Sequence, residues 1–297
     1  MLRRQLIHGS LASLAAKSLA DHHGGAAKNP ETLFKVSLAQ WSNHRALKAA
    51  KFTNMEWPEY TKKTFGIRGL EYVNQFFKDK AEDKTYLAEL KKRVTDLEME
   101  NVLIMIDGEG HLGASSAQER QKTVDQHKKW VEAAQFLGCH SIRVNSHGEG
   151  ETDDEKASNC VKGLSALTTF ANEHEIGIIV ENHGGLSSNG EWMAKVLADV
   201  GMDGCGSLPD FGNFHDYDRY KGLKELMPFA KGVSAKSHDF DAEGNETKTD
   251  FRKALKIVMD FKFHGWIGIE YEGNELSEVE GITATKKLLE KVRSELS

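Results

Sequence analysis

The chain has 297 residues, of which 39% are hydrophobic and 28% charged, and this composition excludes a disordered chain. The formal net charge is -6 and no long run of lysine and arginine is present, so we expect no nucleic-acid partner. Three cysteines without C-x-x-C spacing argue against a disulfide framework and a thiolate zinc site, and we expect them to be small apolar side chains of the core.

The first residues differ from the rest of the chain. Arg3 and Arg4 precede a stretch of small residues over 9–20 that ends in the tripeptide SLA at 18–20, a pattern that resembles a twin-arginine export signal. Lys17 interrupts its apolar core, and an amphipathic N-terminal helix is the alternative. The expected localisation is therefore either cytoplasmic or, through such a signal, periplasmic. No later segment reaches the ~18 apolar residues of a membrane span, so we expect no membrane partner.

From Leu33 onward, short β-branched runs alternate eight times with longer amphipathic stretches, without a linker rich in Pro, Gly or Ser. Each run has about five residues, a usual length for a strand. The absence of a break indicates one domain, which we place at 29–297 after an N-terminal tail at 1–28. The predicted strands are Phe34–Ala39, Gly69–Val73, Val102–Ile106, Ser141–Asn145, Gly177–Glu181, Gly206–Asp210, Gly232–Lys236 and Trp266–Glu270.

The intervening helices are indicated by the residues at their N-termini. Ser or Thr three residues before Glu or Gln predicts a capping box, in which two backbone N–H groups are satisfied reciprocally. Between Phe251 and Phe261, apolar residues recur with the spacing of one helix face, which we expect to pack on the sheet. Four capping boxes are predicted: Ser116 with Glu119, Thr152 with Glu155, Ser188 with Glu191, and Ser277 with Glu280.

Eight strand–helix units imply parallel strands, because each return to the sheet crosses over through a helix. Eight parallel strands close into a (β/α)8 barrel, a TIM barrel, more readily than they form an open sheet. The competing architecture is a doubly wound open sheet. No G-x-G-x-x-G or G-x-x-x-x-G-K-[ST] motif follows any predicted strand, so the signature that usually accompanies that architecture is absent.

Carboxylates follow three of the predicted strands, at the end of a barrel where catalytic residues lie. Glu181, Asp210 and Glu270 each come directly after apolar residues, and the alternation of side chains puts each above small or apolar residues on the inward face. Three carboxylates at one mouth repel one another unless a cation or bound protons neutralise them. The sequence therefore predicts one divalent metal ion, and oxygen ligands with at most one imidazole point to Mn, Mg, Co or Zn.

The segments IIVENHGG, SLPDFGNF, GVSAKSHDFD and WIGIEYEG at these strand ends resemble the sugar phosphate isomerase/epimerase branch of the xylose isomerase-like TIM barrels. The resemblance covers roughly residues 33–296. It implies metal ligands after strands five, six and eight, which are Glu181, Asp210 and Glu270, and one ligand on strand seven.

Two departures from the family pattern affect the expected site. Where family members often carry Asp-x-x-His on strand six, this chain has Asn213, so Asn213 or the nearby His215 is expected to contact the substrate. On strand seven, Lys236 stands where the resemblance implies a histidine ligand, and His238 lies two residues later on the same face. We predict His238 as the metal ligand and Lys236 as a substrate contact. The alternative for Lys236 is an inward ion pair with one of the carboxylates.

The resemblance implies an enzyme that isomerises or epimerises a sugar through an enediolate, with Glu181 and Glu270 as the catalytic base and acid as well as metal ligands. The same residues permit β-elimination, so a keto-sugar or inosose dehydratase or lyase is the close alternative. An apurinic endonuclease-like phosphodiesterase needs more histidine ligands and a basic groove, whereas the loops at this mouth are acidic. A barrel that only binds a sugar would require the carboxylates to be vestigial.

The expected partner is a small-molecule sugar or polyol without a phosphate group. Loops after strands seven and eight commonly bind phosphate in barrels, and here residues 239–246 and 271–278 contain carboxylates but no Lys or Arg. We expect hydrogen bonds to the hydroxyl groups from Lys236, Asn145, His147 and Asn213. The sequence leaves open which sugar is bound and whether the chain forms a homo-oligomer.

Overall fold

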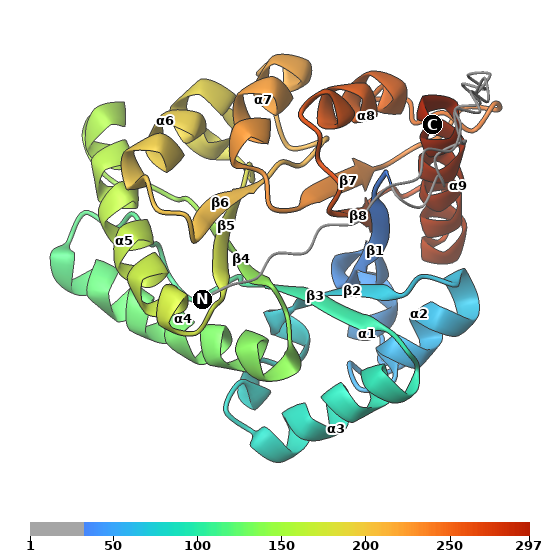
Figure 1. The fold of residues 1–297 in the computed structure, drawn as a ribbon, viewed down its shortest axis with the longest axis horizontal. Coiled ribbons are helices and arrows are strands. Elements are labelled where there is room, and N and C mark those ends of the chain that lie inside the picture. Colours follow the sequence, from blue (N-terminus) through green and yellow to red (C-terminus); the bar gives the residue numbers. More distant parts are fainter. Residues whose placement is uncertain (1–32) are drawn as a thin grey trace, which may run out of the picture.

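The computed structural model describes residues 33–297, so the N-terminal tail and its twin-arginine pattern lie outside the described residues. Eight parallel strands form one sheet in the order β6-β5-β4-β3-β2-β1-β8-β7 and curl into a nearly closed barrel ringed by helices (Figure 1). The chain therefore folds as the predicted (β/α)8 barrel. The strands are β1 (Lys35–Ala39), β2 (Gly69–Val73), β3 (Glu100–Met105), β4 (Ser141–Asn145), β5 (Gly177–Glu181), β6 (Cys205–Leu208), β7 (Val233–Ser237) and β8 (Trp266–Tyr271).

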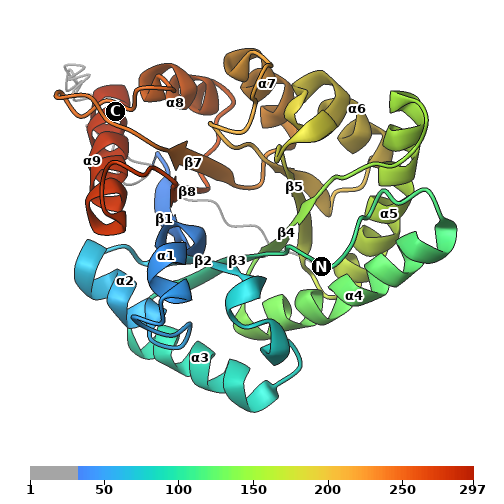
Figure 2. The ribbon, with the colours of Figure 1, turned by 180° about the vertical axis from the view of Figure 1, so that it is seen from behind.

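The helices cover the outside of the barrel, as the view from behind also shows (Figure 2). They are α1 (His44–Lys48), α2 (Trp57–Phe65), α3 (Lys84–Asp96), α4 (Ala117–Leu137), α5 (Asp153–Glu173), α6 (Gly190–Val200), α7 (Arg219–Leu226), α8 (Phe251–Asp260) and α9 (Glu278–Leu296). Short 3-10 helices lie at Gln40–Asn43, Asn74–Phe76, Lys78–Lys80, Gly185–Ser188 and Met227–Phe229. Among residues 33–297, no helix is both long and apolar enough to cross a membrane.

The helix N-termini match three of the four predicted caps. Complete capping boxes start α5 at Thr152 and α9 at Ser277, and Ser116 caps α4 by accepting a hydrogen bond from the backbone N–H of Glu119. The prediction for Ser188 was wrong, because Asn189 is the N-cap of α6. Ser188 lies in the preceding 3-10 turn, where its hydroxyl accepts from the Gly184 N–H and donates to a backbone oxygen in the next strand–helix loop.

The barrel closes between β6 and β7 at the level of the predicted site. β6 ends at Leu208, two residues earlier than predicted, because proline at 209 has no N–H to continue the ladder. An isolated parallel bridge pairs Asp210 with Ser234 instead. Ser234 N–H donates to the Pro209 carbonyl at 2.9 Å, and Phe211 N–H donates to the Ser234 carbonyl at 3.0 Å. The closing contact thereby fixes the backbone of Asp210 against β7.

Apolar side chains fill two separate regions. The larger cluster lies between the sheet and the helices and includes the apolar face of α8. A smaller cluster is built from strand residues and contains Leu103, Met105, Ile179 and Leu208. Since inward and outward side chains alternate along each strand, this smaller cluster fills the barrel interior and supports the polar groups at the mouth. Cys139 and Cys160 are buried and Cys205 is half-buried, all three as free thiols.

Candidate metal centre

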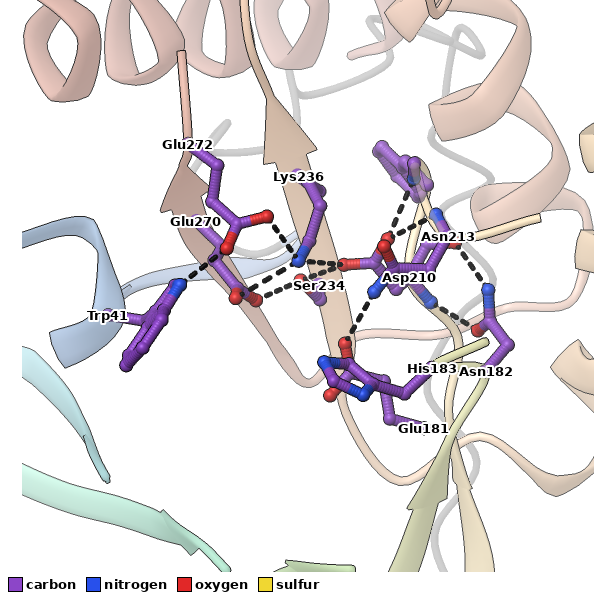
Figure 3. Close-up of polar contacts among 12 residues, drawn as sticks. Trp41, Glu181, Asn182, His183, Asp210, Asn213, Ser234, Lys236, Glu270 and Glu272 are labelled. Carbon is purple, nitrogen blue, oxygen red and sulfur yellow. Dashed lines mark hydrogen bonds and ion pairs between the residues drawn. The ribbon is translucent and has the colours of Figure 1, made fainter. Parts of the chain in front are cut away.

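Three carboxylates converge at the C-terminal mouth of the barrel, where Figure 3 shows them. Glu181 is the last residue of β5, Asp210 follows β6, and Glu270 lies near the end of β8. Each offers an oxygen within 4.8 Å of the others, and the three residues are 0 to 3% exposed. The structure therefore brings together the three residues that the sequence predicted as carboxylate ligands.

Asp210 is held by the turn that follows it. Its Oδ1 accepts from the backbone N–H groups of Gly212 at 2.7 Å and of Asn213 at 2.8 Å. Asn182 pairs with the Asp210 backbone, donating from Nδ2 to its carbonyl at 3.0 Å and accepting its N–H at 2.8 Å. Because these contacts occupy Oδ1, the carboxylate turns its Oδ2 toward the other two acids.

Glu181 is held by an amide and a buried guanidinium. Its Oε1 accepts from Asn213 Nδ2 at 3.1 Å. Arg143 Nε lies 2.8 Å from its Oε2, while the Nη1 of that arginine donates to Asp107 Oδ1 at 2.8 Å. The Arg143–Glu181 contact lacks hydrogen-bond geometry, so Glu181 Oε2 is a buried acceptor without a hydrogen bond to any residue that the structure describes.

Lys236 points into the group of acids from β7. Its ammonium lies 2.9 Å from Glu272 Oε2, 3.2 Å from Glu270 Oε1 and 3.9 Å from Asp210 Oδ2 (Figure 3). Below it on the same strand, the hydroxyl of Ser234 lies 2.7 Å from Asp210 Oδ2 and 3.0 Å from Glu270 Oε2. Lys236 therefore forms the inward ion pair that was the alternative to a substrate contact.

His238 does not belong to the group of converging ligands. β7 ends at Ser237, and His238 begins the next loop, where its backbone N–H donates to Glu246 Oε1 at 3.1 Å. The expectation that His238 meets the carboxylates thus does not match the geometry. The inward place at the end of β7, at the height of the acids, is taken by Lys236.

The other predicted contacts lie around the mouth at different distances from the acids. Asn213 reaches Glu181, and Asn145 donates from Nδ2 to Asp107 Oδ1 at 2.9 Å. His147 is exposed and its ring packs against that of His111, with centroids 4.2 Å apart. His215 is exposed and has a left-handed backbone with φ of 50°. Within the described residues, no hydrogen bond joins His147 or His215 to the three acids.

Burial changes the proton affinity of these groups. It raises the pKa of Glu181 to about 7, against the lowering effect of Arg143, and raises the pKa of Asp210 to about 7, against that of Lys236. Burial alone would lower the pKa of Lys236, but the carboxylates around it, Glu270 first, raise that pKa well above its usual value. Lys236 is therefore a fixed positive charge at neutral pH.

The sequence reasoning missed several buried groups of the site. Arg143 and Glu71 lie inside the barrel below the mouth and are 3% and 1% exposed. Ser37 donates to Glu71, and burial raises the pKa of that carboxyl to about 8. A charged residue at an inward position within an apolar strand is the signal that identifies both. The sequence identifies Glu272 only as one carboxylate of the acidic loop 271–278, whereas in the structure it binds Lys236 and accepts from the Trp41 indole N–H.

The donor set fits a divalent cation. Among residues 33–297, the five carboxylates of Asp107, Glu181, Asp210, Glu270 and Glu272 contact two cationic side chains, Arg143 and Lys236, so negative charge is in excess. Hard oxygen donors suit Mg and Mn, and Zn accepts them as well. A buried acidic triad with an acceptor oxygen left on Glu181 can hold such an ion.

Comparisons with known proteins agree with this architecture. The model of one protein family, xylose isomerase-like TIM barrel, matches residues 60–294. A comparison with curated protein sequences found no match. The chain is similar to the solved structure of the IolI protein with a bound zinc atom, with 15% identity, 88% of this chain and 99% of that chain covered, and a TM-score of 0.71.

Two further solved structures are similar over nearly their whole length. A D-tagatose 3-epimerase-like protein has 19% identity, with 89% of this chain and 100% of that chain covered and a TM-score of 0.71. The 3-keto-D-glucoside 4-epimerase YcjR from E. coli has 12% identity, with 87% and 99% covered and a TM-score of 0.69. At these identities the likeness shows the shared fold.

Proposed function

The chain belongs to the xylose isomerase-like TIM barrel family, and we propose that it is a divalent-metal-dependent isomerase or epimerase of a small, unphosphorylated sugar or polyol. The observation that carries this proposal is the meeting of Glu181, Asp210 and Glu270, three buried carboxylates from separate strands, at the mouth of the barrel. Solved structures of the same fold include one with zinc and one of a keto-glucoside epimerase, which supports the proposal without deciding the reaction.

We assign the metal to Glu181, Asp210 and Glu270. A divalent ion held there would act as a Lewis acid on a substrate carbonyl and so make the hydrogen on the adjacent carbon more acidic. Neighbouring residues hold these carboxylates in position. The turn at Gly212 and Asn213 fixes Asp210, and Ser234 lies between Asp210 and Glu270.

Glu181 and Glu270 are the residues that we propose to move protons at the substrate carbon. Glu181 is a buried carboxylate at the mouth, and a carboxylate in this position can take a proton from the substrate carbon and return it. Arg143 and Asn213 hold that carboxylate in place from two sides. A base and an acid on different strands can act on different faces of one carbon, as an epimerisation requires.

The charges at the mouth favour a substrate without phosphate. Both buried cations, Lys236 and Arg143, are already paired with carboxylates. The loops 239–246 and 271–278 contain no Lys or Arg. A phosphate would therefore meet acidic loops at the place where barrels commonly bind it. The hydroxyl groups of a neutral sugar can instead bind Asn145, Asn213, His147 and His215.

Incubation of free and phosphorylated ketoses with the full chain in deuterated water, with Mn²⁺ added, tests the proposal. We expect deuterium on the carbon next to the carbonyl of free sugars, and exchange slowed by about 10²- to 10⁴-fold when Glu181 is replaced by Gln. Exchange only with phosphorylated sugars would contradict the proposed substrate class. Loss of water from a keto-sugar would identify the enzyme as a dehydratase that uses the same carboxylates, and absence of any exchange or elimination would contradict proton transfer.

A further inference from the structure

Lys236 contacts two of the three carboxylates to which we assign the metal. Its ammonium is 3.2 Å from Glu270 Oε1 and 3.9 Å from Asp210 Oδ2. The side chain is 2% exposed, so solvent screens this charge poorly. A divalent ion that binds Glu270 and Asp210 therefore adds two positive charges beside a third one, and repulsion disfavours the presence of both at these oxygens.

A second acceptor for the ammonium lies beside the first. Glu272 is two residues beyond Glu270, hence on the same face, and its Oε2 is 2.9 Å from Lys236 Nζ. The Glu272 side chain is 29% exposed, and the Trp41 indole donates to its other oxygen. Glu272 is thus oriented from below by Trp41 and can keep a full ion pair with Lys236 without Glu270 or Asp210.

The lysine stem packs closely against the backbone of Gly212. Gly212 faces it, and a Cβ added to Gly212 would lie 3.0 Å from Lys236 Cγ and 3.1 Å from its Cδ. Any larger residue at 212 would press on the stem. A lysine also has a flexible chain of four carbons, which lets a small rotation move the ammonium away from one carboxylate while it stays bound to another.

We propose that the Lys236 ammonium competes with the divalent ion for Asp210 and Glu270, and that it withdraws onto Glu272 when the metal binds. This inference rests on the proposed metal site and deepens it: a residue that is not a ligand sets the metal affinity. Lys236 keeps the acids together in the metal-free protein, and Glu272 determines how readily the ammonium leaves them.

Calorimetric titration of Mn²⁺ into the chelator-treated full chain tests this at one pH. The proteins are wild type, Lys236→Met, Glu272→Gln and the double variant, with Asp210→Asn as the control for the site. We expect Lys236→Met to bind Mn²⁺ about tenfold more tightly or better, because a repelling charge is removed. We expect Glu272→Gln to weaken wild-type binding by about tenfold, and to cost only about twofold in the Lys236→Met background, where no ammonium has to move.

The outcomes separate this inference from the proposed function. Binding that Asp210→Asn abolishes but Lys236→Met does not improve leaves the metal site standing and overturns the competition. An equal or larger cost of Glu272→Gln in the Lys236→Met background overturns the withdrawal, since Glu272 would then act on the metal directly. Absence of Mn²⁺ binding by wild type and Lys236→Met overturns both proposals.

If Lys236→Met does not fold, Lys236→Gln replaces it in the calorimetric titration. A second measurement uses the chain with Lys236 intact. Withdrawal of the ammonium from Glu270 and Asp210 strengthens its pairing with Glu272 and hence weakens the hydrogen bond that Glu272 accepts from the Trp41 indole. Titration of the wild-type chain with Mg²⁺ should therefore change its tryptophan emission by more than that of Trp41→Phe. Identical changes in the two proteins overturn the withdrawal.

Discussion

Two buried cations hold carboxylates at the mouth of this barrel in different ways. Arg143 on β4 places separate nitrogens 2.8 Å from Asp107 and 2.8 Å from Glu181. Lys236 on β7 places one nitrogen among three carboxylates at 2.9, 3.2 and 3.9 Å. A planar guanidinium is committed to its two partners, whereas an ammonium on a flexible stem is shared. We therefore expect Asp107 and Glu181 to stay paired with Arg143, and we call these three residues the fixed wall. The carboxylates around Lys236 can exchange its ammonium, and we call Lys236 and these carboxylates the exchangeable wall.

The largest effect on sugar exchange is expected at Glu181, which is paired with Arg143 and is a proposed proton-transferring residue. Replacement of Glu181 by Gln keeps the shape and the Asn213 contact but removes the proton acceptor, so sugar exchange should fall by about 10²- to 10⁴-fold. Deuterium incorporation by nuclear magnetic resonance measures this. Circular dichroism should remain that of the wild type, and near-normal exchange in a folded variant would exclude Glu181 as the base.

The unfolding free energies of variants should distinguish the role of Arg143 from that of Lys236. Replacement of Arg143 by Met leaves Asp107 and Glu181 without their cation, which should cost about 3 to 5 kcal/mol of unfolding free energy. Mn²⁺ should restore only part of this, because it can neutralise Glu181 but Asp107 lies outside the proposed metal site. Lys236→Met should also lose stability in chelator, but Mn²⁺ should restore most of it.

Urea unfolding with and without Mn²⁺ measures both variants under the same conditions. The distinction between the two walls fails if Mn²⁺ restores Arg143→Met as fully as Lys236→Met.

Glu71, which lies in the barrel below the mouth, should make the stability of the protein depend on pH. Burial first, and then Glu270 and Glu181, raise its pKa from 4.5 to about 8 in the folded chain. A carboxyl whose pKa is raised by folding stabilises the protein fully below pH 4.5, and that contribution is lost as the pH rises to about 8. In chelator, the unfolding free energy of wild type should therefore fall over this range by up to a few kcal/mol more than that of Glu71→Gln.

Urea unfolding at several pH values from 5 to 8 measures the difference. Parallel curves for the two proteins would show that Glu71 does not take up a proton in this range.

The smallest effect is expected from Ser234, which lies between the exchangeable acids. Ser234→Ala removes one hydroxyl that can donate to either Asp210 or Glu270 but changes no charge. The free energy of Mn²⁺ binding should become less favourable by about 1 kcal/mol, which is a few-fold loss of affinity. Calorimetry detects it, and a loss as large as that of Asp210→Asn would mean that the hydroxyl itself holds the ion.

Most of the fold could be predicted because strand runs and helix caps are local signals. Gly69–Val73, Ser141–Asn145 and Gly177–Glu181 have the predicted bounds, whereas β6 is shorter because Pro209 ends its ladder. Ser188 shows the limit of a local signal: the i, i+3 pattern is present, but the chain makes a 3-10 turn first and Asn189 becomes the cap.

The site could be predicted only as far as strand alternation reaches. Alternation places Lys236 and His238 on one face and does not say which lies at the height of the acids. That height depends on where β7 ends and on the bond from the His238 backbone to Glu246, which comes from a distant part of the loop. The pattern of carboxylates at strand ends does not include Arg143, although alternation along β4 places its side chain on the inward face.

The central claim is that Glu181, Asp210 and Glu270 together bind one divalent ion. A crystal of the full chain soaked in Mn²⁺ and measured near the manganese absorption edge tests it most directly. The account predicts one anomalous peak bounded by these three carboxylates, with Lys236 on Glu272. A peak elsewhere, or no peak between the three acids while Lys236 remains on Glu270, would contradict it.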